Sequence, residues 1–183
     1  VAVFVLAACG DTGSGGATAP ATSQASPLPP LSVTSADLAG GTFPKELTCD
    51  GASRAPVISL AGIPAATQSV AIEVLDPDAP SGNFTHWLAF SDGAAAATIA
   101  TFPPAGSVEG RNDAGGTGYT GPCPPQGPPH HYHVMVFALG FSLGKDGAGL
   151  TGGFSRTQLE DAIKSNRGSL LARGDLVATY ARA

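Results

Sequence analysis

Short runs of β-branched and aromatic residues, each closed by a turn rich in glycine or proline, set the strongest limit on what this chain can fold into. The clearest runs lie at 69–75 (SVAIEVL), 86–90 (HWLAF), 133–139 (HVMVFAL) and 176–180 (LVATY), with a shorter one at 58–60. Short strands separated by such turns and by long connections are typical of an antiparallel sandwich or barrel. We therefore predict a mainly β domain.

One helix is predicted near the C-terminus. The segment 155–158 (SRTQ) matches a capping box, in which the serine and the glutamine satisfy each other's backbone amides. Leu159 and Ile163 follow four residues apart, so they share one face, and residues 166–168 (NRG) end the helix.

The first residues predict export and lipidation. Residues 1–8 are wholly apolar and stop at Cys9, and the sequence Leu6-Ala7-Ala8-Cys9 resembles the bacterial lipobox, whose cysteine receives a lipid. We interpret 1–8 as a signal-peptide remnant and Cys9 as the lipidated residue. The alternative is a frayed apolar strand with an incidental cysteine.

The next segment predicts a tether. Between residues 10 and 30, 18 of 21 residues are Gly, Ala, Ser, Thr or Pro, which offer little apolar area to offset the entropy of ordering. We expect 9–30 to be a disordered tether that holds a folded domain, 31–183, at the outer face of a membrane of a bacterial cell envelope. Without Cys9, the same composition would indicate only a disordered N-terminus.

Charge excludes one large class of function. The chain carries 9 Lys and Arg against 14 Asp and Glu, for a net charge of −5, which is too little positive charge for a protein that tracks nucleic-acid phosphates. Its apolar runs also stay below the ~18 residues that a transmembrane helix needs.

Polar residues gather where the predicted strands begin and end. Asp76 and Asp78 lie in a turn stiffened by two prolines (DPDAP, 76–80), directly after the first long strand, and His86 opens the next one. A loop at 118–127 (GYTGPCPPQG) leads into the segment 130–133 (HHYH). Side chains alternate along a strand, so His130 and Tyr132 should point one way, and residues 131 and 133 the other.

Together these motifs resemble the phosphatidylethanolamine-binding protein family, in particular its bacterial YbhB/YbcL-type, Raf-kinase-inhibitor-like branch. The resemblance rests on 76–80 (DPDAP), 86–88 (HWL), 121–127 (GPCPPQG) and 130–132 (HHY), with support from 47–51 (LTCDG) and 111–113 (RND), and it runs from about residue 43 to 182. It implies a two-sheet antiparallel β-sandwich with one or two short helices near the C-terminus.

The resemblance also implies a pocket for a phosphate-type anion or a phospholipid headgroup. Carried over to this sequence, its ligand-binding residues are Asp76, Asp78, His86, Gly121, Pro122, His130 and Tyr132. We expect imidazole, phenol and loop amide groups to donate to the anion, and Asp76 to orient an imidazole or to share a proton with the ligand. Asp78 could equally satisfy only turn amides. Where relatives usually read His-Arg-Tyr, this chain has His131 in the middle.

The same residues allow three alternatives to anion binding: a metal site, a hydrolase and a protein-interaction module. Four histidines and two aspartates could hold zinc, but His131 and His133 face away from His130, so we expect no metal and no cofactor. A hydrolase is disfavoured because no G-x-S-x-G elbow is present, and we predict no enzymatic activity. A protein-interaction module that inhibits a kinase or protease is the remaining alternative.

The cysteines give one further expectation. With Cys9 assigned to lipid, Cys49 and Cys123 remain in an oxidising compartment, and the family topology would bring both of their loops to the pocket. We hypothesise a disulfide between them, the alternative being two unpaired thiols.

Overall fold

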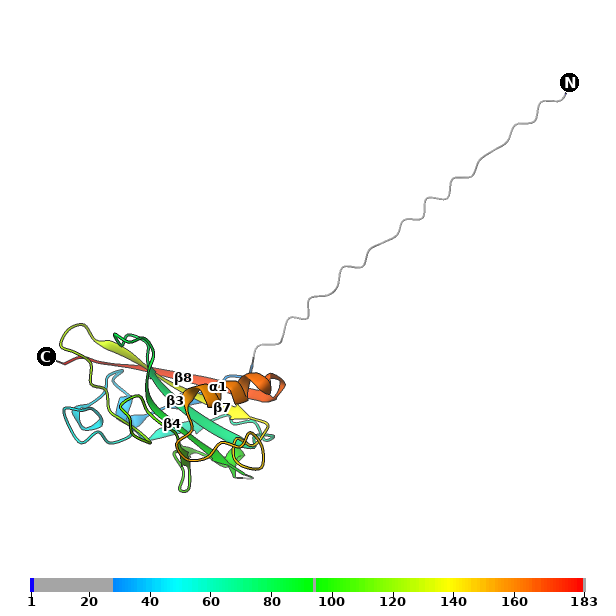
Figure 1. Cartoon of the computed structure of the whole chain (residues 1–183), viewed down its shortest axis with the longest axis horizontal. Coiled ribbons are helices and arrows are strands. Elements are labelled where there is room, and N and C mark those ends of the chain that lie inside the picture. Colours follow the sequence, from blue (N-terminus) through cyan, green and yellow to red (C-terminus); the bar gives the residue numbers. More distant parts are fainter. Residues whose placement is uncertain (2–27, 94, 183) are drawn as a thin grey trace.

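The computed structural model describes residues 28–93 and 95–182, together with Val1 (Figure 1). Cys9, the rest of the predicted signal remnant and residues 10–27 of the predicted tether therefore lie outside the described residues. The described elements are the strands β1 (Ser32–Thr34), β2 (Ile58–Ala61), β3 (Ser69–Asp76), β4 (Phe84–Asp92), β5 (Thr101–Phe102), β6 (Val108–Glu109), β7 (His130–Leu139) and β8 (Leu170–Tyr180), and the helix α1 (Arg156–Ser165).

The strands form two antiparallel sheets. The larger sheet has five strands in the order β6-β4-β3-β7-β8, and the smaller sheet has three in the order β1-β2-β5. Every pairing within both sheets is antiparallel. The prediction of a mainly β, two-sheet antiparallel fold is confirmed.

The central strand β3 is covered on both faces, and all eight of its residues are buried. On one face, Val70, Ile72 and Val74 pack in a core shared with the small sheet. On the other face, Ala71 packs in a second core with residues from α1 and from the loop before it. Because both faces are buried, β3 reads as a nearly continuous apolar run, which is why it is the clearest strand in the sequence.

Helix α1 covers the second face, lying over β3 and β7 in Figure 1. The predicted capping box is present: Ser155 Oγ accepts from the Gln158 amide, and the Gln158 side chain accepts from the Ser155 amide. Leu159 is the fully buried anchor of the helix in the second core. Among the described residues, no helix is both long enough and apolar enough to cross a membrane.

Three strands are longer than predicted by more than one residue. β4 spans Phe84–Asp92 rather than 86–90, so His86 is its third residue and does not open it. β7 begins at His130 rather than at residue 133, and β8 begins at Leu170 rather than at residue 176. Arg173 and Asp175 break the apolar pattern in the first half of β8, with Gly174 between them. A Cβ atom on Gly174 would lie only 2.3 Å from the carbonyl oxygen of Leu31, so the crossing of the N-terminal segment over β8 requires glycine there.

One carboxylate is buried within the second core. Glu73 lies in the middle of β3, 4% exposed, opposite Leu88 on β4 and Met135 on β7. Its Oε1 lies 3.1 Å from Arg156 Nε, at the start of α1. Burial raises the pKa of Glu73 to about 7, although the Arg156 charge opposes this. A group of this kind makes stability depend on pH.

Candidate functional site

A cavity of about 350 Å³ lies at the end of the large sheet where β3 stops and β4 and β7 start. Antiparallel pairing brings these strand ends together, since Asp76 at the end of β3 pairs with Phe84 at the start of β4. Asp76, His86 and His130 all line the cavity. The remaining wall comes from the turn after β3, from Phe84, and from the loop that carries Gly121 and Cys123.

Asp76 orients one imidazole. Its Oδ2 lies 2.7 Å from His130 Nδ1, and its Oδ1 accepts from the backbone amide of Asp78 at 2.9 Å. The Asp76 side chain is 5% exposed and that of His130 is 12% exposed, so the pair is nearly dry. A carboxylate accepts hydrogen bonds, and the proton on His130 therefore resides on Nδ1, which leaves Nε2 for a ligand.

His86 is held in the same tautomer by a different acceptor. Its Nδ1 donates to the Thr120 carbonyl at 2.9 Å, and the Thr120 amide donates back to the His86 carbonyl at 2.9 Å. This reciprocal pair fixes the ring against the loop and again leaves Nε2 available. Burial lowers the pKa of His86, against the raising effect of the Thr120 carbonyl, so the ring is neutral at neutral pH.

Tyr132 lies beneath the site and does not line the cavity. It is fully buried, and its ring meets those of His86 and Phe43 edge to face, with centroids 5.2 and 5.3 Å apart. Its hydroxyl has no hydrogen-bond partner of ordinary geometry among the described residues. Burial, and then the nearby Asp76 carboxylate, raise the pKa of the phenol well above its usual value. Tyr132 is therefore a neutral support for the His86 ring.

Besides Tyr132, two residues carried over from the family pattern do not line the cavity. Asp78 is exposed, and its Oδ2 accepts from both the amide and the Nδ1 of His131, each at 2.8 Å; these bonds lower the pKa of Asp78. Pro122 contributes its carbonyl to the amide of Cys49 instead of lining the cavity. The turn after Asp76 directs the two aspartates apart, one inward and one outward.

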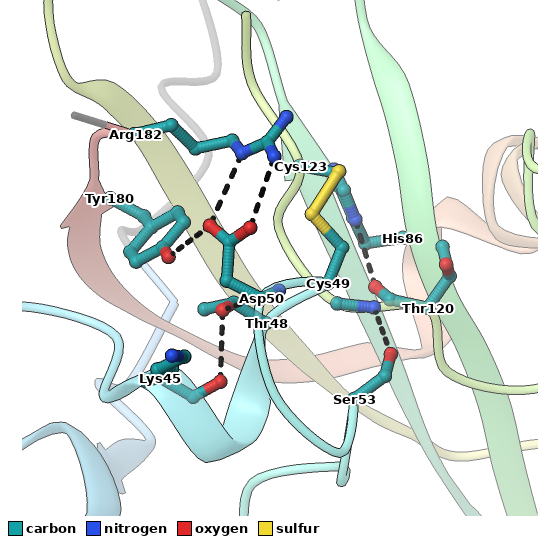
Figure 2. Close-up of a disulfide and its surroundings, with 11 residues drawn as sticks. Lys45, Thr48, Cys49, Asp50, Ser53, His86, Thr120, Cys123, Tyr180 and Arg182 are labelled. Carbon is teal, nitrogen blue, oxygen red and sulfur yellow. Dashed lines mark hydrogen bonds and ion pairs between the residues drawn. A yellow bond between two sulfur atoms is a disulfide. The ribbon is translucent and has the colours of Figure 1, made fainter. Parts of the chain in front are cut away.

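The loop that carries Cys49 packs against the loop of the cavity wall and is bonded to it (Figure 2). A disulfide joins Cys49 to Cys123, whose Cα atoms are 5.4 Å apart. The amide of Gly121 donates to Ser53 Oγ at 2.8 Å. A Cβ atom on Gly121 would lie 2.6 Å from the Leu47 carbonyl oxygen, so the two loops pack backbone against backbone.

The same loop is tied to the end of the chain. Asp50 accepts from the Tyr180 hydroxyl at 2.7 Å and from Arg182 Nε at 3.2 Å (Figure 2). Arg182 also forms a parallel bridge with Gln126, which follows the cavity wall. The wall is therefore fastened both to the Cys49 loop and to the last residues of β8.

Most of the loop amides that were expected to donate to an anion are absent or already used. Residues 122, 124 and 125 are prolines and have no N–H group. The amide of Gly121 is used by Ser53, and the amide of Thr120 is used by the His86 carbonyl. Prolines stiffen this wall at the expense of hydrogen-bond donors.

Sequence reasoning did not single out Thr120, Ser53 or Phe84. Thr120 fixes the His86 ring through its main chain, and a main-chain role leaves no mark on residue identity. Ser53 adopts a positive φ of 52°, a backbone conformation that a serine in the sequence does not indicate. Phe84, two residues before His86, packs on the His86 ring at 4.7 Å between centroids.

Within residues 28–93 and 95–182, no group of three or more His, Cys, Asp or Glu side chains is arranged to hold a metal ion. His131 and His133 each pair with a separate aspartate, Asp78 and Asp175, on the surface. The titratable side chains that line the cavity are thus one carboxylate and two imidazoles.

Two antiparallel sheets, with an Asp–His cavity at the end of the larger one, define a class of β-fold binding protein, and comparison with known proteins places the chain within it. The family model described as phosphatidylethanolamine-binding protein matches residues 33–181. A UPF0098 protein of Pyrococcus horikoshii is 39% identical over 148 residues, covering 76% of this chain and 71% of the relative. The chain belongs to the phosphatidylethanolamine-binding protein family.

Two solved structures of the same family resemble the fold of this chain. A phosphatidylethanolamine-binding protein homologue from Chlamydia trachomatis superposes with a TM-score of 0.72 at 27% identity, covering 84% of this chain and 99% of that one. Escherichia coli YbcL, described as a member of the mammalian family, gives a TM-score of 0.71 at 27% identity, covering 85% of this chain and all of its own (100%). In sequence, YbcL is 39% identical over 104 residues, covering 50% of this chain and 55% of YbcL.

Proposed function

We propose that the domain binds a small phosphorylated ligand, of the kind found in a phospholipid headgroup, in the cavity lined by Asp76, His86 and His130. The observation that carries the proposal is the convergence of these three side chains, from three strands, at the base of one cavity. Membership of a family named for phosphatidylethanolamine binding supports the same ligand chemistry.

The size and lining of the cavity favour a headgroup over a whole lipid. About 350 Å³ is at the small end of the range for ligand pockets, roughly 300–1,000 Å³. The lining is apolar at Pro80, Phe84, Pro124 and Pro125 and polar at Asp76, His86 and His130. A phosphate group fits at the base, while acyl chains would remain outside.

Isothermal titration calorimetry with O-phosphoethanolamine tests this function. We expect saturable binding, and we expect His86→Ala and His130→Ala each to lower the affinity by about 10-fold or more, because each removes a hydrogen-bonding ring from the cavity. His133→Ala is the matched control, because His133 lies on the other face of β7 and pairs with Asp175. Unchanged affinity in both cavity variants would refute the assignment of the site.

Sedimentation with vesicles distinguishes the two sources of the phosphate. Binding to phosphatidylethanolamine vesicles that is lost in His130→Ala indicates a lipid headgroup as the ligand. Binding of O-phosphoethanolamine without vesicle binding indicates a free phosphate ester. The absence of saturable binding to either probe would overturn the proposed function.

We also propose that the domain is anchored to the cell envelope by lipid on Cys9. The support is the apolar run 1–8 that ends at a lipobox-like Leu6-Ala7-Ala8-Cys9. When the protein is produced with its native export signal, fatty-acid labelling should be present and should be lost in Cys9→Ser, which should also leave the membrane fraction. Labelling that persists in Cys9→Ser would contradict the proposal.

A further inference from the structure

The cavity presents hydrogen-bond acceptors where an oxyanion needs donors. His130 uses its Nδ1 proton on Asp76, and His86 uses its Nδ1 proton on the Thr120 carbonyl. A neutral imidazole carries a single ring proton, so both Nε2 atoms carry lone pairs. The third polar group at the base, the Asp76 carboxylate, only accepts.

The rest of the lining supplies no compensating charge. Neither Lys nor Arg is among the residues that line the cavity. The wall consists largely of prolines without N–H groups, and the amides of Thr120 and Gly121 are already used. The hydroxyl of Ser81 lines the cavity but is neutral, and Tyr132, beneath it, stays protonated. An anion placed here would lie beside a buried carboxylate with no cation to balance it.

We infer that the cavity binds a titratable oxyanion, such as a phosphate monoester, together with one proton, which is held between a ligand oxygen and Nε2 of His130. This inference rests on the proposed function. The proton comes from solvent, the Nε2 lone pair accepts it, and an Nε2–H···O bond to the ligand forms; no other bond is made or broken. The bound state then contains an imidazolium between two anions, Asp76 and the ligand.

His130 is the better proton carrier of the two histidines. Its Nδ1–H faces a carboxylate, which stabilises the imidazolium, whereas that of His86 faces a neutral carbonyl and burial lowers the His86 pKa. The other titratable groups near this pair come from several elements. They are Asp76 at the end of β3, Asp78 in the turn after it, Asp113 in the loop after β6, Tyr132 on β7, and Tyr180, which pairs with His130 from β8.

Calorimetry in buffers of different ionisation enthalpy measures the proton directly. At about pH 8, where free O-phosphoethanolamine carries a fully ionised phosphate, the observed enthalpy should vary with buffer enthalpy with a slope near one proton taken up per ligand. Above that pH, affinity should fall about 10-fold per pH unit.

His130→Gln supplies the test variant, because glutamine keeps an amide near the place of Nε2 but does not titrate. Binding should persist at reduced affinity with proton uptake close to zero. His131→Gln is the matched control: the neighbouring ring points outward to Asp78, so its uptake should equal that of the wild type.

The outcomes separate this inference from the proposed function. Saturable binding by the wild type without dependence on buffer enthalpy would overturn the inference and leave the function intact. Uptake that persists in His130→Gln would overturn the assignment of the proton to His130. The absence of binding would overturn both.

Discussion

Replacing Cys49 and Cys123 together by serine is expected to lower the free energy of unfolding by about 4 kcal/mol. The disulfide links residues 74 positions apart, and in the chain-entropy model a closed loop of this length removes about that much entropy, as free energy, from the unfolded chain. Urea unfolding of the variant and the parent checks the value. Both proteins should carry Cys9→Ser, so that no free thiol remains.

The same variant should keep its ligand affinity nearly unchanged. The wall stays attached through the Cys49 amide on the Pro122 carbonyl and the Gly121 amide on Ser53 Oγ, at 3.1 and 2.8 Å. The disulfide then acts chiefly on the unfolded state and not on the geometry of the site. A stability loss below about 1 kcal/mol would contradict the entropic account.

Glu73→Gln is expected to stabilise the protein by up to about 3 kcal/mol at about pH 8 and to leave it unchanged at about pH 4. The folded state holds the Glu73 proton to a pKa of about 7, against an ordinary value of 4.5, so the folded state binds this proton more tightly. Stability from this group is therefore fully present below about pH 4.5, falls as the pH rises, and is gone above about pH 7. Glutamine fills the same space without a charge to desolvate.

The control for this prediction is Glu160→Gln. Glu160 shares Arg156 with Glu73, at 2.8 Å from Arg156 Nε, but it lies at the surface of α1, and its pKa is lowered by its Lys164 and Arg156 partners although burial opposes them. Its removal should cost at most about 1 kcal/mol near neutral pH. A Glu73→Gln variant whose stability difference from the parent does not change with pH would refute the assignment.

The strands that can be predicted from the sequence are those whose apolar side chains are buried in the core. β3 and the later part of β7 carry long apolar runs because they lie in the middle of the large sheet. β1, β5 and β6 are two or three residues long and too short to show a period, so they were not predicted. Their positions depend on pairing with distant strands.

In the candidate site, the residues could be predicted from the sequence, but most of their hydrogen-bond partners could not. Asp76, His86 and His130 could be chosen from sequence because each stands at or within two residues of a strand end. Alternation along β7 predicts that residue 131 points away from the cavity. The expected role of Asp76 in orienting an imidazole agrees with its bond to His130 Nδ1. The tautomer of His86 could not be predicted, because it is fixed by the main-chain carbonyl of Thr120. That Ser53 and the His86 carbonyl would occupy the amides of Gly121 and Thr120 could not be predicted, because these are tertiary contacts.

The fastening of early residues to β8 determines when the domain can finish folding. The Phe43 amide donates to the Thr179 carbonyl, and Asp50 binds Tyr180 and Arg182, so segments made early pack against β8, the last strand of the described fold. The large sheet therefore cannot be completed before β8 has been made. Until β8 is made, β7 is an unpaired edge with its hydrogen-bonding groups exposed. A chain that lacks β8 thus presents an edge prone to aggregation, which β8 covers in the folded domain.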